Sequence, residues 1–170
     1  VPWASGRPDY AALEQWLASD APKYLHGSKS QLKTLAAAGL PLGGIAFDTT
    51  LGAWLLKPGL KPESLENQVY DYLGETLQVS DPNQLVPENE GASPATEAWY
   101  ILRISEYLAG KLDPGSRSVL DEIELPLVPV LATMERTGIT VNRAILGELT
   151  SELGATASEV AQKAFAEIGR

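Results

Sequence analysis

The residues of this sequence that could do chemistry are mostly carboxylates. The chain has 22 Asp and Glu residues, a single His and no Cys. Without Cys there is neither a thiolate metal site nor a disulfide framework. Carboxylates bind hard divalent ions only where several of their oxygens converge on one point. A metal site in this sequence would therefore require elements that bring several carboxylates together.

The sequence does not favour a Ser-His-Asp catalytic site or a glycine-rich phosphate-binding loop. His26 is the only histidine, so any Ser-His-Asp arrangement would have to include it, but its neighbours indicate a residue at the end of a strand. Gly43 and Gly44 lack the further glycine and the Lys-Ser/Thr pair of a phosphate-binding loop. Neither nucleophilic catalysis nor nucleotide binding by such a loop is predicted.

The charge and hydropathy of the chain argue against a broadly basic nucleic-acid-binding protein and against a membrane protein. The formal net charge is −9 and the sequence pI about 4.6, whereas proteins bind phosphate backbones mainly through Lys and Arg. Any DNA contact must therefore be local or come from parts outside this sequence. No apolar run approaches the roughly 18 residues of a membrane helix, and no signal peptide is visible. We expect a cytoplasmic protein without membrane contact, and the missing initiator Met fits a piece of a longer chain.

The hydrophobic spacing predicts mostly helices. Strands are expected at 23–27 and 42–47, and an exposed loop at 75–93. Ser28 and Gln31 have the spacing of a capping box at the start of the helix after the first strand, and Asp48 is placed to cap the helix after the second. The expected helices cover residues 10–19, 28–38, 49–57, 62–73, 94–112, 119–137 and 143–168.

This pattern predicts a helix-rich α/β fold with a truncated sheet, because two short strands rarely stand alone. Trp16 and Trp54 recur at helical spacing with leucines and are expected in the core. Pro126 and Pro129 should interrupt the hydrogen bonding of their helix and bend it. The last helix carries an apolar stripe that needs a partner, formed by Leu146, Leu149, Leu153, Val160 and Ile168.

Three segments resemble the family A DNA polymerases, of the bacterial DNA polymerase I type. Residues 44–58 read G-I-A-F-D-T-T-L-G-A-W-L-L-K-P, and residues 64–74 read S-L-E-N-Q-V-Y-D-Y-L-G. The most specific segment, residues 121–139, reads D-E-I-E-L-P-L-V-P-V-L-A-T-M-E-R-T-G-I and resembles the family's junction into the polymerase thumb. All three occur in the family's order and spacing.

The resemblance implies a domain plan and partners. Residues 1–115 would be the later part of a ribonuclease H-like (DnaQ-like) 3′–5′ exonuclease domain, and residues 116–170 the junction and the first thumb helices. The parent chain would be a Mg²⁺-dependent DNA-directed DNA polymerase of replication and repair. Its partners would be DNA and, in cis, the remaining polymerase domain. The fragment itself is expected to be a monomer or a weak self-associate.

The resemblance also identifies the positions where nuclease chemistry would lie. In the family, the metal ligands come from an Asp-x-Glu on the first strand, an N-x-x-x-D segment and a Y-x-x-x-D segment. The last two fall here at Gly27 to Gln31 and Ser93 to Glu97. Gly27 replaces the Asn, Gln31 the carboxylate and Ser93 the Tyr, so that only Glu97 remains acidic. The resemblance thus implies a degenerate site with no metal or cofactor, in a domain that acts as a scaffold.

Ordinary structural roles fit the same residues. Gln31 would complete the capping box of Ser28, Ser93 would cap its helix, and Glu97 would favour the helix dipole. Two alternatives stay open: a non-enzymatic helical interaction module, and an active exonuclease completed by carboxylates from upstream motifs.

Overall fold

The computed structural model describes residues 11–59, 64–78 and 92–169, which fall into two compact units, Val1–Arg136 and Thr137–Arg170. Most of the loop predicted at 75–93 lies outside the described residues. Within the described residues no helix is long and apolar enough to cross a membrane.

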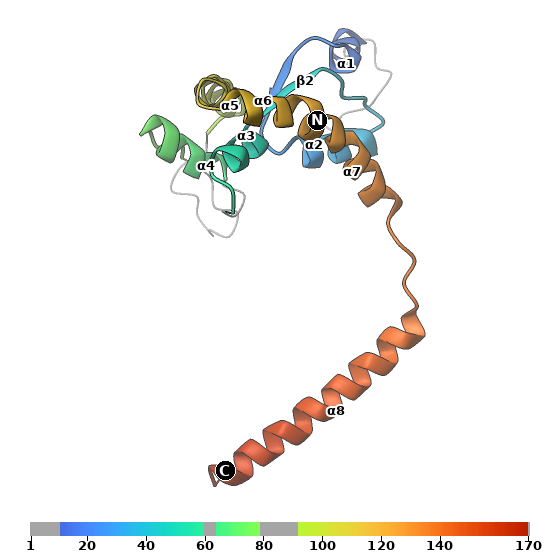
Figure 1. Ribbon diagram of the computed structural model, residues 1–170. Coiled ribbons are helices and arrows are strands. Elements are labelled where there is room, and N and C mark those ends of the chain that lie inside the picture. The colour runs from blue at the N-terminus through green and yellow to red at the C-terminus, as the bar shows by residue number, and fades with distance from the viewer. Residues whose placement is uncertain (1–10, 60–63, 79–91, 170) are drawn as a thin grey trace. The chain divides into compact units, whose positions relative to one another are not determined.

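The first unit is built on a two-stranded parallel sheet (Figure 1). Strand β1 (Lys23–Leu25) pairs with β2 (Ile45–Asp48), and the connection between them contains α2 (Ser28–Ala37). Gly44 precedes β2 with φ +65°, and a Cβ there would lie only 2.8 Å from the carbonyl carbon of Asp20. Both the positive φ and this close approach favour glycine at position 44, where the chain enters β2 beside the loop before β1. The expectation of few, short strands is confirmed.

Helices line the core of this unit. Buried side chains come from α3 (Thr49–Leu56), from α4 (Leu65–Gln68) with the π-helical turn η2 (Val69–Leu73), and from α5 (Pro94–Ala109), whereas α1 (Ala11–Ala18) has no buried residue. Helix α5 packs against α3, β1 and η2. The fully buried core side chains come from β2, η2, α5 and the segment after it, and include Phe47, Val69, Ile104, Leu108 and Leu120.

The segment with the two prolines departs from α-helical hydrogen bonding. It runs through α6 (Pro114–Val119), the π-helical turn η3 (Leu120–Glu124) and α7 (Leu125–Thr137). The backbone N–H of Leu125 donates to the carbonyl of Leu120, five residues back. Because Pro126 has no N–H and its ring crowds the carbonyl four residues earlier, a wider turn just before it removes the conflict. The predicted interruption is confirmed just before Pro126, whereas α7 continues through Pro129, and the predicted bend stays a prediction.

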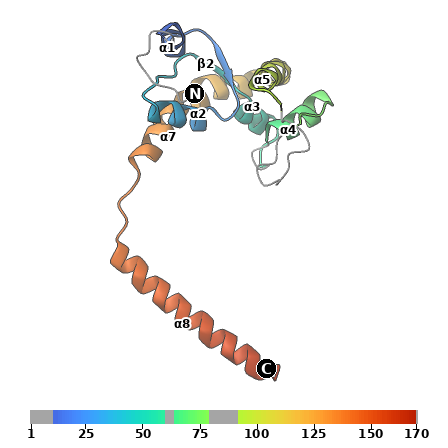
Figure 2. The ribbon, with the colours of Figure 1, turned by 180° about the vertical axis from the view of Figure 1, so that it is seen from behind.

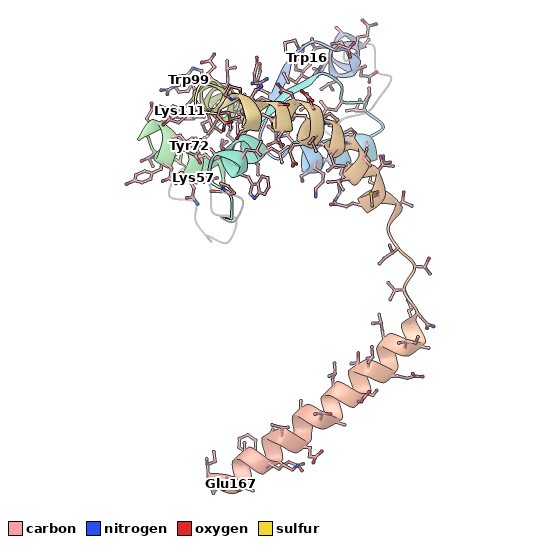
Figure 3. All side chains as sticks on the ribbon, viewed as in Figure 1. Trp16, Lys57, Tyr72, Trp99, Lys111 and Glu167 are labelled. Carbon is pink, nitrogen blue, oxygen red and sulfur yellow. The ribbon has the colours of Figure 1, made fainter. Side chains whose placement is uncertain are left out.

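The tryptophans are less buried than their spacing predicts. Trp16 is 48% exposed and Trp54 44% exposed, so the prediction that both lie in the core is wrong. The ring of Trp16 instead covers a cation, since the Lys23 ammonium lies 4.8 Å from its centroid. A similar arrangement links α3, η2 and α5 (Figure 3). Lys57 lies over Tyr72 and Lys111 over Tyr107, and the two tyrosine rings are 5.7 Å apart.

The second unit contains α8 (Arg143–Glu167), which agrees with the helix predicted at 143–168. The side-chain oxygen of Asn142 accepts the backbone N–H groups of Ala144 and Ile145 and so caps the helix. None of the α8 residues is buried.

Candidate functional site at the carboxyl ends of the strands

The loops that follow the two parallel strands meet around one carboxylate. Asp48, at the end of β2, accepts the backbone N–H of Gly27 at 3.2 Å, that of Ser28 at 2.6 Å and that of Thr50 at 2.8 Å. It also accepts the hydroxyl of Ser28. Asp48 therefore caps α3, as predicted, and also holds the first turn of α2.

The capping box predicted for Ser28 and Gln31 is wrong. Helix α2 begins at Ser28, and the residue before it is Gly27 in the left-handed conformation, φ 68°. Because the N–H and hydroxyl of Ser28 are both bonded to Asp48, Ser28 has no capping role of its own. The amide nitrogen of Gln31 donates to the backbone carbonyl of His26 at 2.9 Å. The carboxylate of Asp48, at the end of β2, instead accepts the N–H groups at the start of α2.

His26 lies just after β1, as predicted for a residue at a strand end. Its Nδ1 is 2.8 Å from the Thr49 hydroxyl oxygen. Burial lowers the pKa of His26, against the opposing influence of Asp48, Glu66 and Gln68. The ring is therefore neutral near pH 7 and serves as a polar link between the two strand-end loops.

Two of the four predicted site positions share one cavity. A cavity of about 300 Å³ is lined by His26, Gln31, Ser64, Leu65, Glu66, Glu97 and Ile101. Glu97 stands in the first turn of α5, as predicted. Ser93 does not line the cavity, and its hydroxyl oxygen accepts the N–H of Thr96 at 3.2 Å, which confirms its role as an N-cap. Gly27 lines a separate cavity of about 310 Å³ beside Ser28 and Asp48.

The shared cavity does not fit a pair of divalent ions. Its carboxylates are those of Glu66 and Glu97, while Gln31 supplies only a neutral amide and already bonds to His26. Within residues 11–59, 64–78 and 92–169 no group of three or more His, Asp or Glu side chains is arranged to hold a metal ion. Sequence reasoning missed Glu66, because nothing in its own segment indicates that α4 lies beside α5.

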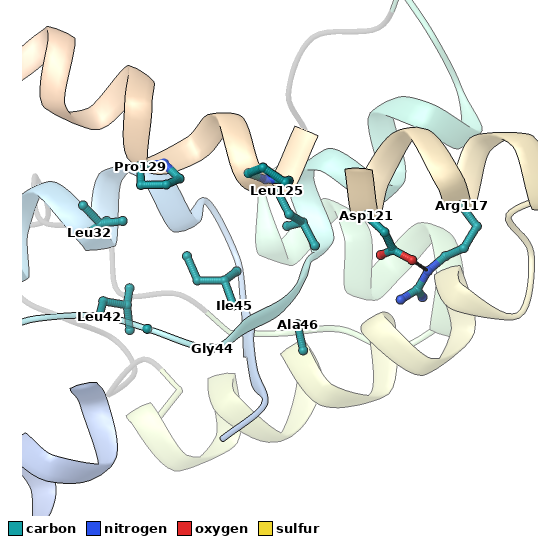
Figure 4. A pocket seen from close by; sticks show the side chains of 11 residues that line it. Leu32, Leu42, Gly44, Ile45, Ala46, Arg117, Asp121, Leu125 and Pro129 are labelled. Carbon is teal, nitrogen blue, oxygen red and sulfur yellow. Dashed lines mark hydrogen bonds and ion pairs between the residues drawn. The ribbon is translucent and has the colours of Figure 1, made fainter. Parts of the chain in front are cut away.

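The cavity of about 590 Å³ shown in Figure 4 has a different character. Its walls are mostly apolar residues of α2, β2 and α7. At one end Arg117 and Asp121 form an ion pair of 2.6 Å. None of the four predicted site positions lines it, so this cavity has no part in the candidate chemistry.

The described fold is thus a helix-rich α/β domain whose two parallel strands end at a polar site centred on Asp48. No family model matches the chain. Over 95% of its length it is 37% identical to DNA polymerase I of Mycobacterium leprae, and over 75% it is 33% identical to that of Pseudomonas aeruginosa. It covers 19% and 16% of these two proteins.

A solved structure agrees with the sequence relatives. The POL domain of Pol1 from M. smegmatis, in complex with DNA primer-template and dNTP, is similar over 96% of this chain and 28% of that one, with a TM-score of 0.72 and 32% identity. The chain is a relative of bacterial DNA polymerase I, which confirms the resemblance of the three sequence segments. It spans about a fifth of the length of the curated relatives it matches, 19% in the case of M. leprae.

Proposed function

We propose that this chain is the degenerate 3′–5′ exonuclease-like segment and thumb junction of a DNA polymerase I, and that it acts as a scaffold without nuclease activity. The fold is proposed to be the later part of a ribonuclease H-like domain. The division at residues 115 and 116 belongs to the same proposal. The parent protein would synthesise DNA on a template with Mg²⁺, in cytoplasmic replication and repair.

The observation that carries the proposal is the hydrogen bond between Gln31 and His26. At the position where the resemblance expects a metal-binding carboxylate, this chain has an amide whose nitrogen donates to a backbone carbonyl at 2.9 Å. A carboxylate cannot make that bond, because it has no hydrogen to donate. The residue at position 31 is thus integrated into the fold as a donor.

The charge of the cavity supports the same conclusion. Two divalent ions bring four positive charges, and two-metal phosphodiester hydrolysis requires both ions to clamp the reacting oxygens. The cavity offers the two carboxylates of Glu66 and Glu97. Neutral oxygens and water compete poorly with bulk hydration for Mg²⁺, so the cavity does not compensate the charge of a metal pair.

A scaffold role is supported by the contacts that fix α7. The carboxylate oxygens of Glu135 form ion pairs with the ammonium groups of Lys29 at 2.7 Å and Lys33 at 2.6 Å, and both lysines belong to α2. Figures 1 and 2 show α2 beside α7 from both sides. The helix that ends the first unit is therefore joined by two ion pairs to the same helix that carries Gln31.

The nuclease part is tested by incubating the purified chain with labelled single-stranded DNA and Mg²⁺ or Mn²⁺. We expect no cleavage above a buffer control. Cleavage that a chelator stops and that Glu97→Ala abolishes would show that the site is active and the proposal wrong. Cleavage that survives Glu97→Ala would indicate a contaminating nuclease, and the assay would be repeated on repurified protein.

The polymerase part is tested on the parent protein by primer extension. We expect Mg²⁺-dependent extension that Gln31→Leu and Glu97→Ala leave unchanged, because neither residue is placed in the polymerase site. A parent protein without extension activity would contradict the assignment and favour the helical interaction module.

A further inference from the structure

The cavity shown in Figure 4 meets strand β2 at its edge. Its lining includes Gly43, Gly44, Ile45 and Ala46, which follow one another where the chain enters this strand. Successive side chains of a strand point to opposite faces of the sheet, so a cavity that touches both Ile45 and Ala46 lies beside the strand and not over one face. No residue of β1 lines the cavity, which places it on the side of β2 away from β1.

The backbone of Ile45 faces this outer edge. The N–H of Lys23 in β1 donates to the carbonyl of Gly44 at 2.8 Å. Because backbone carbonyls alternate from side to side along a strand, the carbonyl of Ile45 points away from β1, and its N–H points the same way. Within the described residues β2 has β1 as its only strand neighbour. An extended segment placed along this edge would therefore find one donor and one acceptor for backbone pairing.

The walls of the cavity suit aliphatic side chains. They are formed mainly by Leu32 of α2, Leu42 of the loop before β2, and Leu125 and Pro129 of α7. A strand added to an open edge gains affinity from backbone hydrogen bonds, while its alternate side chains enter neighbouring pockets. A helix would leave the edge unused, because its own backbone groups are already paired. The edge and the cavity together thus fit an extended peptide.

A cation marks one end of the cavity. Arg117 lies towards Ala46, whereas Leu42 lies at the other end, where β2 begins (Figure 4). The Nε of Arg117 donates to Asp121 at 2.6 Å, while its Nη groups donate to no described residue. A guanidinium binds carboxylates through paired N–H groups. A peptide that runs parallel to β2 would end near Arg117, so its terminal carboxylate would meet this cation.

We propose that the outer edge of β2 and this cavity form a docking site for the extended C-terminal tail of a separate polypeptide. The backbone of the tail pairs with Ile45, its aliphatic side chains enter the cavity, and its terminal carboxylate binds Arg117. A second copy of this chain fits less well, because a twofold axis would pair two β2 edges antiparallel and bring no carboxyl terminus to Arg117. The inference goes beyond the proposed function, since it involves neither the nuclease positions nor DNA synthesis.

The carboxylate contact is tested by fluorescence anisotropy with the purified chain. The probe is a pentapeptide of alternating Val and Thr with an N-terminal fluorophore and a free C-terminal carboxylate. We expect saturable binding that becomes at least about tenfold weaker when the C-terminus is an amide, because a charge-assisted hydrogen bond is lost. Arg117→Gln should remove the difference between the acid and the amide. Arg103→Gln is the matched control, since it also removes an ion-paired arginine but one outside the cavity, and circular dichroism confirms that both variants are folded.

Backbone pairing is tested on the peptide, independently of any protein variant. Alternate residues of an added strand direct their N–H groups towards β2, and the others direct theirs away. N-methylation of one alternate set should weaken binding at least about tenfold, and N-methylation of the other set should leave it unchanged. The amide of Ile45 should exchange its hydrogen more slowly in the complex.

Four outcomes overturn the proposal. Equal binding of acid and amide would show that Arg117 receives no terminal carboxylate. Equal effects of the two N-methylated sets would show that the peptide adds no strand to β2. Absence of saturable binding by this peptide and by its counterparts with Leu, Ile or Phe in place of Val would show that the edge takes no aliphatic tail. Binding to the isolated chain that is lost in the parent protein would show that another part of that protein covers the edge.

Discussion

The carboxylate of Asp48 accepts both the backbone N–H and the hydroxyl of Ser28, which lies twenty residues earlier and begins another helix. Asp48 is only 2% exposed and also accepts the N–H of Gly27 and Thr50. One buried carboxylate thereby closes the first turns of α2 and α3 and joins the ends of both strands. Its buried charge is tolerated because several donors surround it.

Asp48→Ala should therefore lower the free energy of unfolding by about 3 kcal/mol, because it leaves the buried N–H and hydroxyl of Ser28 and the partly buried N–H groups of Gly27 and Thr50 without their acceptor. The measurement is urea denaturation followed by circular dichroism. Asp113→Ala is the matched control, since Asp113 caps α6 through the N–H groups of Gly115 and Ser116 but is exposed to solvent. We expect a clearly smaller loss for Asp113→Ala. Equal losses would show that burial of Asp48 is unimportant.

Most of the helices could be predicted from sequence because their signals are local. Ser93, Asn142 and Asp48 each stand just before an apolar periodic segment, and each caps the helix that follows. Gln31 shows where such reasoning fails. Its spacing from Ser28 matches a capping box. In the structure, however, the N–H and the hydroxyl of Ser28 both donate to Asp48, which lies at the end of β2. Asp48 reaches Ser28 only because β1 and β2 pair in parallel, and residue spacing within one helix does not reveal this pairing.

The candidate site was predictable only in part, for the same reason. The family resemblance identifies Gln31 and Glu97, and the structure places both in one cavity. The contribution of Glu66 depends on how α4 packs beside α5, which is a tertiary contact without a local signal. The exposure of Trp16 was missed because helical spacing does not distinguish a core ring from one that covers a lysine.

His26 should make the stability of the chain depend on pH near neutrality. Burial lowers its pKa in the folded protein from the ordinary value of 6.5. The unfolded chain therefore binds the proton first, so stability is fully present above pH 6.5 and falls as the pH drops towards the folded pKa. We expect the urea midpoint to fall between pH 7.5 and 5.5. As the chain has no other histidine, His26→Gln should flatten this decline, and an unchanged decline would contradict the assignment.

Glu135 should affect the stability of the chain at lower pH than His26 does. Hydrogen bonds from Lys29 and Lys33 lower its pKa from 4.5 to about 2. This contribution is present above pH 4.5 and is lost as the pH falls towards 2. The side chains are about 40% exposed, so solvent weakens the effect on unfolding. Glu135→Gln should lower the melting temperature at pH 7 in low salt, and 1 M NaCl should shrink the difference. A difference that does not change with salt would point to packing instead.

Gly44 should tolerate no side chain. Its φ of +65° already disfavours other residues, and a Cβ would lie 2.8 Å from the carbonyl carbon and 3.0 Å from the carbonyl oxygen of Asp20. Backbone atoms cannot move aside as a flexible side chain can, so we expect Gly44→Ala to cost more than about 2 kcal/mol. Gly59→Ala is the control, because Gly59 has φ +89° but open space around its Cα. Similar losses at both positions would assign the effect to φ alone.

Replacing Gln31 with the family's carboxylate should harm the fold without restoring a nuclease. Gln31→Asp removes the donor to the His26 carbonyl and adds a negative charge to the cavity that already holds Glu66 and Glu97. We expect a loss of about 1 kcal/mol at pH 7, from the lost hydrogen bond and the repulsion between like charges. Gln31→Leu is the control, because it removes the donor without adding charge and should lose less.

Metal sites act as a unit, so a single repair is not expected to recover activity. Thermal unfolding with and without 10 mM Mg²⁺ and the single-strand cleavage assay measure both effects. A Mg²⁺-dependent rise in the melting temperature of Gln31→Asp, together with cleavage, would show that one residue separates this site from an active one.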